Sequence, residues 1–170
     1  MNAESFKALQ KPIKDKYREQ PDEALITLHA ESNMDEGIAC SVQTGTAMVK
    51  AGLHPATGGD GSLACSGDML LQALAACAGV TLKAVATGMD IGIKSGRVIA
   101  DGDLDFRGTL GVDRSAPVGF KQIRLRFELD TDAAPEKVEK LIQLTERYCV
   151  VLQTLRNSPV ITVENQRSDG

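Results

Sequence analysis

Residues 66–89 read SGDMLLQALAACAGVTLKAVATGM, and this stretch decides the fold. Its apolar residues cover nearly every side of a helix, and Gln72, Thr81 and Lys83 are rare polar interruptions. Ser66 is the expected N-cap, and Asp68 falls in the first turn, where the helix dipole favours an acid. A helix without a polar face is buried on all sides, so the sequence predicts a central helix. In so short a chain, we expect a second subunit to help cover it.

Alternating patterns on both sides of this helix indicate β-strands. Before it, residues 24–30 and 37–43 alternate with period two, and a further strand runs through Met48 and Lys50. After it, residues 98–106 and 123–129 alternate apolar side chains with charged ones. Such strands are half-buried and antiparallel, with one face in water.

A second helix is expected from about Asp132 or Pro135, and its apolar stripe runs through Cys149 to Leu152. It should end before Asn157, and residues 160–163 should form a final strand. The order of elements predicts an α+β fold in which two cysteine-bearing helices pack on an antiparallel sheet.

The first twenty residues are set apart from this pattern. Apolar residues at helical spacing predict a short amphipathic helix, with Pro12 as an interruption near its middle. We therefore divide the chain into an N-terminal helical extension, residues 1–20, and one domain, residues 21–170.

Charge and composition exclude several classes of function. The net charge is −4 and the basic residues are scattered, so the chain lacks the basic face of a nucleic-acid-binding protein. The N-terminus lacks the apolar core that a secretory signal needs. The sequence also contains no uninterrupted run of 18 apolar residues, so it predicts no membrane span. We expect a cytoplasmic protein, where thiols stay reduced unless they are catalytic or redox-sensing.

A metal centre is not expected either. The four cysteines contain no CxxC spacing, and the only imidazoles are His29 and His54. The sequence also contains no P-loop motif, and we expect neither a metal nor another cofactor.

Cys77 and Cys149 are the residues most suited to chemistry. Each lies on the apolar stripe of its helix, so the two thiols can face each other if the helices pack. A disulfide needs Cα atoms within roughly 7 Å, which helices with small side chains allow. From the pattern alone, two buried structural cysteines remain the alternative, because free cysteine is among the most buried residue types.

The segment GGDGSLACSGDMLLQALAACAGVTLKAVA, followed some seventy residues later by ERYCVVLQTL, resembles the OsmC/Ohr family of osmotically inducible and organic hydroperoxide resistance proteins. The resemblance covers residues 24–163. It implies an OsmC-like fold that forms an intertwined homodimer, with the two cysteine helices at its centre and active sites at the subunit interface.

The resemblance also implies thiol peroxidase chemistry. Cys77 would be the peroxidatic thiolate that attacks the O–O bond, and Cys149 would resolve the sulfenic acid as a disulfide. A dithiol reductant, lipoyl-linked or thioredoxin-like, would restore both thiols. The expected activity is the reduction of organic hydroperoxides or related oxidants.

One part of the family's pattern is missing. The arginine that activates the thiolate has no equivalent between Arg18 and Arg97, and the position of its glutamate partner is Gly67. The open candidates for a substitute are the cations Lys50, Lys83, Arg97 and Arg156 and the neutral donor His54.

Five residues near the cysteine helix are candidates for a substrate pocket: His54, Asp68, Leu70, Leu74 and Thr81. His54 opens the loop HPATGGDG, whose glycines could bring backbone N–H groups to a ligand or form a simple crossover. Thr81 could donate to the Cys77 thiolate or to a local carbonyl. Because the expected lining is apolar, alkyl or lipid peroxides are the expected substrates. The alternatives are a non-catalytic binder of a small apolar ligand and a redox sensor.

Overall fold

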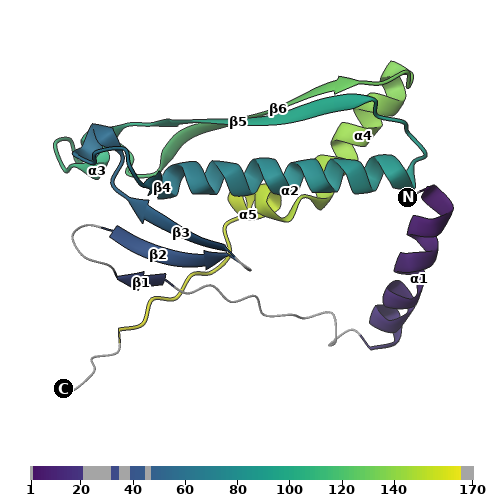
Figure 1. Cartoon of the computed structure of the whole chain (residues 1–170), viewed down its shortest axis with the longest axis horizontal. Coiled ribbons are helices and arrows are strands. Elements are labelled where there is room, and N and C mark those ends of the chain that lie inside the picture. The colour runs from purple at the N-terminus through teal and green to yellow at the C-terminus, as the bar shows by residue number, and fades with distance from the viewer. Residues whose placement is uncertain (1, 21–31, 35–38, 45–46, 166–170) are drawn as a thin grey trace.

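The computed structural model describes residues 2–20, 32–34, 39–44 and 47–165, and everything below concerns these residues (Figure 1). A central helix, α2 (Ser66–Gly88), runs the length of the domain, as the sequence predicts. It carries one buried stripe at intervals of four residues, made of Leu74, Ala78, Leu82 and Ala86. This spacing places the four side chains on one face, so α2 has a buried side and an open side within the single chain.

A two-stranded antiparallel ribbon covers α2 along its length. It consists of β5 (Ser95–Leu104) and β6 (Phe120–Asp130). Its inner side chains, such as Val98 and Phe127, pack into the core, and its outer face carries cross-strand ion pairs. The prediction of two antiparallel strands with one wet face is confirmed.

A four-stranded sheet precedes α2 in the sequence. Its strands are β1 (Ser32–Met34), β2 (Ala39–Thr44), β3 (Ala47–Gly52) and β4 (Ala64–Cys65), in that order across the sheet. The pairs β1–β2 and β2–β3 are antiparallel, but β3–β4 is parallel, and this sheet is separate from the β5–β6 ribbon. The expectation of one antiparallel sheet was therefore too simple. The strand predicted at residues 24–30 lies outside the described residues.

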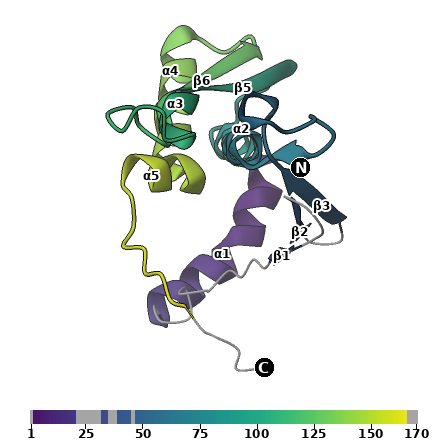
Figure 2. The ribbon, with the colours of Figure 1, turned by 90° about the vertical axis from the view of Figure 1, so that its left-hand side faces the viewer.

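The second cysteine helix is broken in the middle, contrary to the prediction. Helix α4 (Pro135–Tyr148) ends just before Cys149, and α5 (Val150–Arg156) begins just after it. Cys149 has extended backbone angles, φ −72° and ψ 107°, so it cannot continue the helix. Figure 2 views α2 nearly end-on and shows α4 and α5 on the opposite side of it from β3.

The core forms two clusters along α2. One gathers Leu74, Ala78, Cys149 and Leu152, and the other gathers Leu82, Ala86, Ile91 and Leu141. The first cluster contains the thiol of Cys149 and packs against Cys77, so the cysteine pair belongs to the core itself.

Both ends of the chain differ from expectation. Helix α1 (Ala3–Glu19) runs without a break through Pro12, which removes one N–H donor but does not end the helix. Residues 160–163 form no strand, because no described strand pairs with them, and Val160, Ile161 and Val163 are almost fully exposed. Two short helices, a 3₁₀ turn at Pro55–Thr57 and α3 (Phe106–Thr109), were not predicted.

Candidate functional site

The centre of the candidate site is the contact between α2 and the break that separates α4 from α5. Cys77 is half-buried on α2, and Cys149 at the break is fully buried with 0% exposure. The Cys149 thiol donates a hydrogen bond to the sulfur of Cys77, and both cysteines are free thiols. The helix packing therefore brings together the two residues that the sequence singled out.

The break supplies two further donors to Cys77. The backbone N–H groups of Val151 and Val150, the first residues of α5, donate to the Cys77 sulfur. In a continuous helix these N–H groups would bond to carbonyls four residues earlier. Because the chain is extended at Cys149, they are directed to the thiol instead.

These contacts move the two pKa values in opposite directions. Burial raises the pKa of Cys77, but the hydrogen bonds from Val151, Cys149 and Val150 together lower it below the ordinary value. Burial raises the pKa of Cys149, and its own donation to Cys77 adds to that rise. A pair of this kind favours a Cys77 thiolate beside a protonated Cys149.

Two of the five predicted pocket residues lie close to this pair. Leu74 is fully buried in the cluster that contains Cys149. The Thr81 hydroxyl donates to the Cys77 carbonyl at 2.8 Å, which is the backbone alternative.

The other three predicted pocket residues lie at the start of α2. Asp68 and Leu70 precede Cys77 on α2 by about 14 and 11 Å along the axis at 1.5 Å per residue, and His54 caps the 3₁₀ turn that precedes α2. Within the single chain, these three do not form a common pocket with the cysteine pair.

His54 and Leu70 instead line a cavity of about 380 Å³ at the start of α2, together with Cys65 and Phe106. The His54 ring stacks on the Phe106 ring with centroids 4.9 Å apart. Its Nδ1 accepts a hydrogen bond from the Ala56 N–H, so a neutral His54 carries its proton on Nε2. The loop at residues 54–61 is thus an ordered turn.

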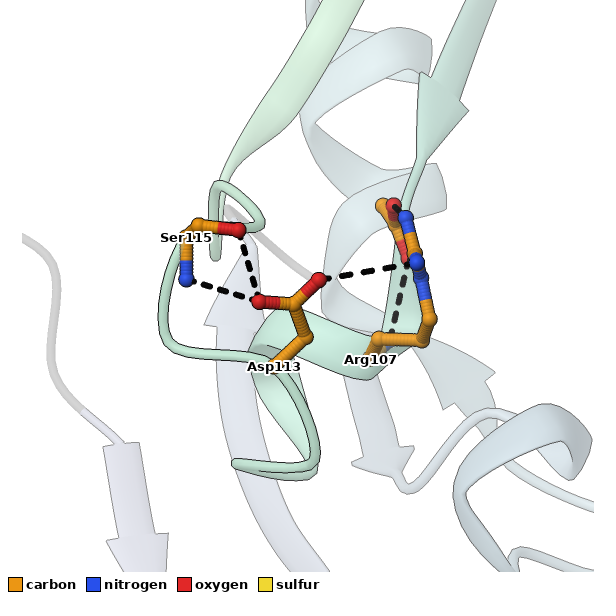
Figure 3. Close-up of polar contacts among 4 residues, drawn as sticks. Arg107, Asp113 and Ser115 are labelled. Carbon is orange, nitrogen blue, oxygen red and sulfur yellow. Dashed lines mark hydrogen bonds and ion pairs between the residues drawn. The ribbon is translucent and has the colours of Figure 1, made fainter.

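Part of the lining of this cavity, including Thr109 and Val118, comes from the segment between β5 and β6. Arg107 holds this segment through polar contacts (Figure 3). The guanidinium of Arg107 donates to both oxygens of Asp105, at 3.0 and 2.6 Å, and forms an ion pair with Asp113 at 3.5 Å. Asp113 in turn accepts from the N–H and hydroxyl of Ser115. Hydrogen bonds from Arg107 lower the pKa of Asp105 to about 2.

The structure supplies no cation in place of the missing arginine among the residues it describes. Arg97 pairs with Glu128 at 2.5 Å and Arg156 pairs with Glu146 at 2.9 Å, while Lys50 and Lys83 are exposed. None of these is among the main causes of the Cys77 pKa shift.

The position of the missing glutamate is also unsuited to a charge. A Cβ atom at Gly67 would lie 3.5 Å from Leu104 and Phe120 and 3.6 Å from the sulfur of Cys65. A carboxylate there would begin against apolar side chains.

Sequence reasoning missed the donors at Val150 and Val151, because backbone groups are not visible in a side-chain pattern. A weak signal was present. Two β-branched residues in succession follow Cys149, and such residues have lower helix propensity than the alanine or leucine of α2. The N-cap was also misplaced by one residue, because Cys65 occupies that position and Ser66 is the first residue of α2.

Within the described ranges, no group of three or more His, Cys, Asp or Glu side chains is arranged to hold a metal ion. Of the helices described, α2 alone is long and apolar enough to cross a membrane by length and composition. Core helices pass the same test, and α2 contributes the buried stripe of both core clusters.

Several solved structures share the fold of this chain. The OsmC-like protein of Mycoplasma pneumoniae is 17% identical, with a TM-score of 0.66 over 78% of this chain and 89% of that one. An organic hydroperoxide resistance protein OsmC of Legionella pneumophila is 18% identical, with a TM-score of 0.61 over 78% and 91% of the two chains. One from Elizabethkingia anophelis, with thiocyanate bound, is 17% identical, with a TM-score of 0.62 over 79% and 91%.

Identities at this level show a shared fold and nothing finer. No curated protein matches the chain. The family model described as OsmC-like protein matches residues 59–164, which is more than half of the sequence and includes both cysteines of the candidate site. The chain therefore belongs to the OsmC-like family.

Proposed function

We propose that this protein reduces organic hydroperoxides through a peroxidatic Cys77 and a resolving Cys149. The observation that carries the proposal is the packing of Cys77 against the buried Cys149 and the start of α5, where hydrogen bonding from the Cys149 thiol and from the N–H groups of Val151 and Val150 lowers the Cys77 pKa. A thiolate is the nucleophile in such chemistry, and these donors favour a thiolate without any cation. Two proteins of similar fold are named organic hydroperoxide resistance proteins, which adds support at the level of the family.

The proposed reaction balances with the two thiols alone. The Cys77 thiolate attacks the terminal oxygen of the hydroperoxide, the O–O bond breaks, and Cys77 becomes a sulfenic acid. The departing alkoxide takes the proton of the Cys149 thiol and leaves as an alcohol. The Cys149 thiolate then attacks the Cys77 sulfur, forms the disulfide and expels hydroxide.

A dithiol reductant closes the cycle. Its two thiols reduce the Cys77–Cys149 disulfide and become a disulfide themselves, whether they belong to a lipoyl group or to a thioredoxin-like protein. Because Cys149 is fully buried, the reductant must first attack Cys77, the more exposed of the two sulfurs.

We further propose that the active unit is a homodimer in the cytoplasm. The side of α2 that faces away from its buried stripe is open, and Val80 on it is 73% exposed. Small residues around Val80, among them Ala73 and Ala76, would let a second backbone approach closely. The exposed apolar residues 160–163 provide a second surface for a partner copy to cover.

The deciding experiment is thiol-coupled turnover of cumene hydroperoxide, with dihydrolipoamide as the reductant. We expect turnover by the wild type, none by Cys77→Ser, and none by Cys149→Ser beyond the first equivalent of peroxide. The matched control is Cys65→Ser, which changes the thiol in the cavity beside His54 and should retain full activity. Equal activity of the wild type and Cys77→Ser would refute the proposal.

The cavity beside Cys65 favours a second candidate function, the binding of a small apolar ligand. Its walls include Leu70, Leu104 and Phe120, and the stacked pair of His54 and Phe106 is suited to an aromatic ring. Its volume of about 380 Å³ is within the range of small-molecule sites. If no disulfide forms between Cys77 and Cys149 after mild peroxide treatment, this function becomes the better proposal. A disulfide without turnover would indicate a redox sensor.

A further inference from the structure

The break at Cys149 raises the question of what keeps it open. In a continuous helix, the N–H of Val150 would bond to the carbonyl of Glu146, four residues earlier. In the structure that carbonyl accepts a hydrogen bond at 2.8 Å from the side-chain amide of Gln153. The Val150 N–H is thereby free to donate to the Cys77 sulfur.

We infer that Gln153 is a positioning residue for Cys77, because its side-chain amide occupies the Glu146 carbonyl across the break and so keeps the backbone donor of Val150 on the thiol. The inference rests on the proposed role of Cys77. Gln153 does not touch the reacting sulfur. It acts by taking the acceptor to which Val150 would otherwise return.

The position of Gln153 suits this role. It lies on the first turn of α5, and its own backbone N–H bonds to the Cys149 carbonyl at 2.9 Å, as in a regular helix. The side chain is therefore anchored to the residue at the break while its amide reaches back across the break to α4. The hydrogen bond is partly shielded from water. Loss of the Gln153 amide would therefore leave the Glu146 carbonyl without a donor, which favours a bond to another N–H.

A second contact crosses the same break but is weaker. Arg156 on α5 forms an ion pair with the carboxylate of Glu146 at 2.9 Å, and its side chain is 53% exposed. Exposed ion pairs contribute little, and this one does not occupy the backbone carbonyl. Of the two braces, Gln153 alone competes with Val150 for the acceptor.

The surroundings of Cys77 make its titration a clean measure of this role. Side chains that α2, β5, β6 and α5 contribute to the cluster are apolar, including Leu74, Val98, Leu125 and Leu155. The titratable group that faces Cys77 is the thiol of Cys149. Arg147 is exposed, whereas Glu146 is half-buried and, paired with Arg156, lines a cavity that also contacts Leu74 of this cluster.

The test is a pH titration of the backbone amide signals of Val150 and Val151 by NMR. In the wild type, both signals should shift with one midpoint that lies below the ordinary thiol value, and the response should vanish in Cys77→Ser. In Gln153→Met, which keeps the length but lacks the donor, the midpoint should rise by about one unit and the Val150 signal should lose its response.

Two further variants make the test specific. Gln143→Met places the same change on the exposed face of α4, where the amide bonds only to Glu139, and should leave the midpoint unchanged. Gln153→Lys restores a donor that can reach the carbonyl and should keep a low midpoint in 0.5 M salt, which screens its added charge.

An unchanged midpoint in Gln153→Met, even with a lowered melting temperature, would overturn the inference. If Gln153→Met does not fold, Gln153→Lys decides, and a raised midpoint there would overturn it as well. A wild-type midpoint equal to that of a thiol in the denatured protein would instead count against the proposed function, so the two failures are distinguishable.

Discussion

The Cys149 thiol donates to the sulfur of Cys77 across the interface of two helical segments, and one of those segments is broken at Cys149 itself. The same residue therefore provides the partner thiol and the backbone geometry that sends two N–H groups to Cys77. Four predictions follow from this arrangement and from its surroundings.

The two thiols should react with iodoacetamide in different pH ranges. Hydrogen bonds to the sulfur lower the pKa of Cys77 despite its burial, whereas burial raises the pKa of Cys149. Cys77 should therefore alkylate with a midpoint below that of a thiol in the denatured protein, and Cys149 with a midpoint above it. Peptide mass spectrometry after timed labelling measures both. Denatured protein is the control, in which the midpoints should coincide, and a native Cys149 that reacts first would contradict the prediction.

Replacement of Cys149 should separate its two roles. In Cys149→Ser a hydroxyl donor remains, so Cys77 should keep a low pKa, but its sulfenic acid should persist after peroxide treatment. In Cys149→Ala the donor is also lost, and the Cys77 pKa should rise. Trapping by dimedone and the alkylation midpoint measure the two effects. If both variants gave the same midpoint, the thiol donor would have no influence on Cys77.

Leu74 should be among the residues whose truncation costs most stability. Its side chain has 0% exposure and packs in the cluster that contains Cys149. Leu74→Ala should lower the free energy of unfolding by about 2–5 kcal/mol. Leu70→Ala, one turn earlier on the same helix and 38% exposed, should cost clearly less. Urea denaturation of both variants provides the comparison, and similar losses would be inconsistent with the packing described here.

The loop held by Arg107 should loosen in acid. Hydrogen bonds from Arg107 lower the pKa of Asp105 to about 2, against about 3.9 in an unfolded chain. Since the folded pKa is the lower one, the stabilisation is complete above about pH 4 and is lost as the pH falls toward 2. Pepsin cleavage within residues 105–119 should accelerate over that range in the wild type.

Arg107→Met serves as the reference for this experiment, because the ion pair is then absent at every pH. Cleavage of its loop should be fast throughout. A wild-type loop that is cleaved at one rate from pH 4 to pH 2 would show that Asp105 does not hold it.

Much of the fold could be predicted because it depends on patterns within single segments. The apolar run from Ser66 gave α2 almost to the residue, and the alternation through Val98 and Phe127 gave β5 and β6. The predictions of secondary structure were wrong where contact with another segment of the chain determines the structure. Residues 160–163 are all β-branched and so favour a strand, but a strand forms only where another strand pairs with it.

The candidate site divides in the same way. The sequence by itself determined which thiols could react, because their motifs and the apolar stripes that carry them are local properties of the chain. The tertiary structure decided which groups lower the pKa of Cys77. The donors to Cys77 are the backbone N–H groups of Val150 and Val151. Every residue except proline carries such a group, and it can reach a thiol only where a helix breaks beside that thiol. Hydrogen bonds depend on position in space, so no spacing of residues along the chain could reveal them.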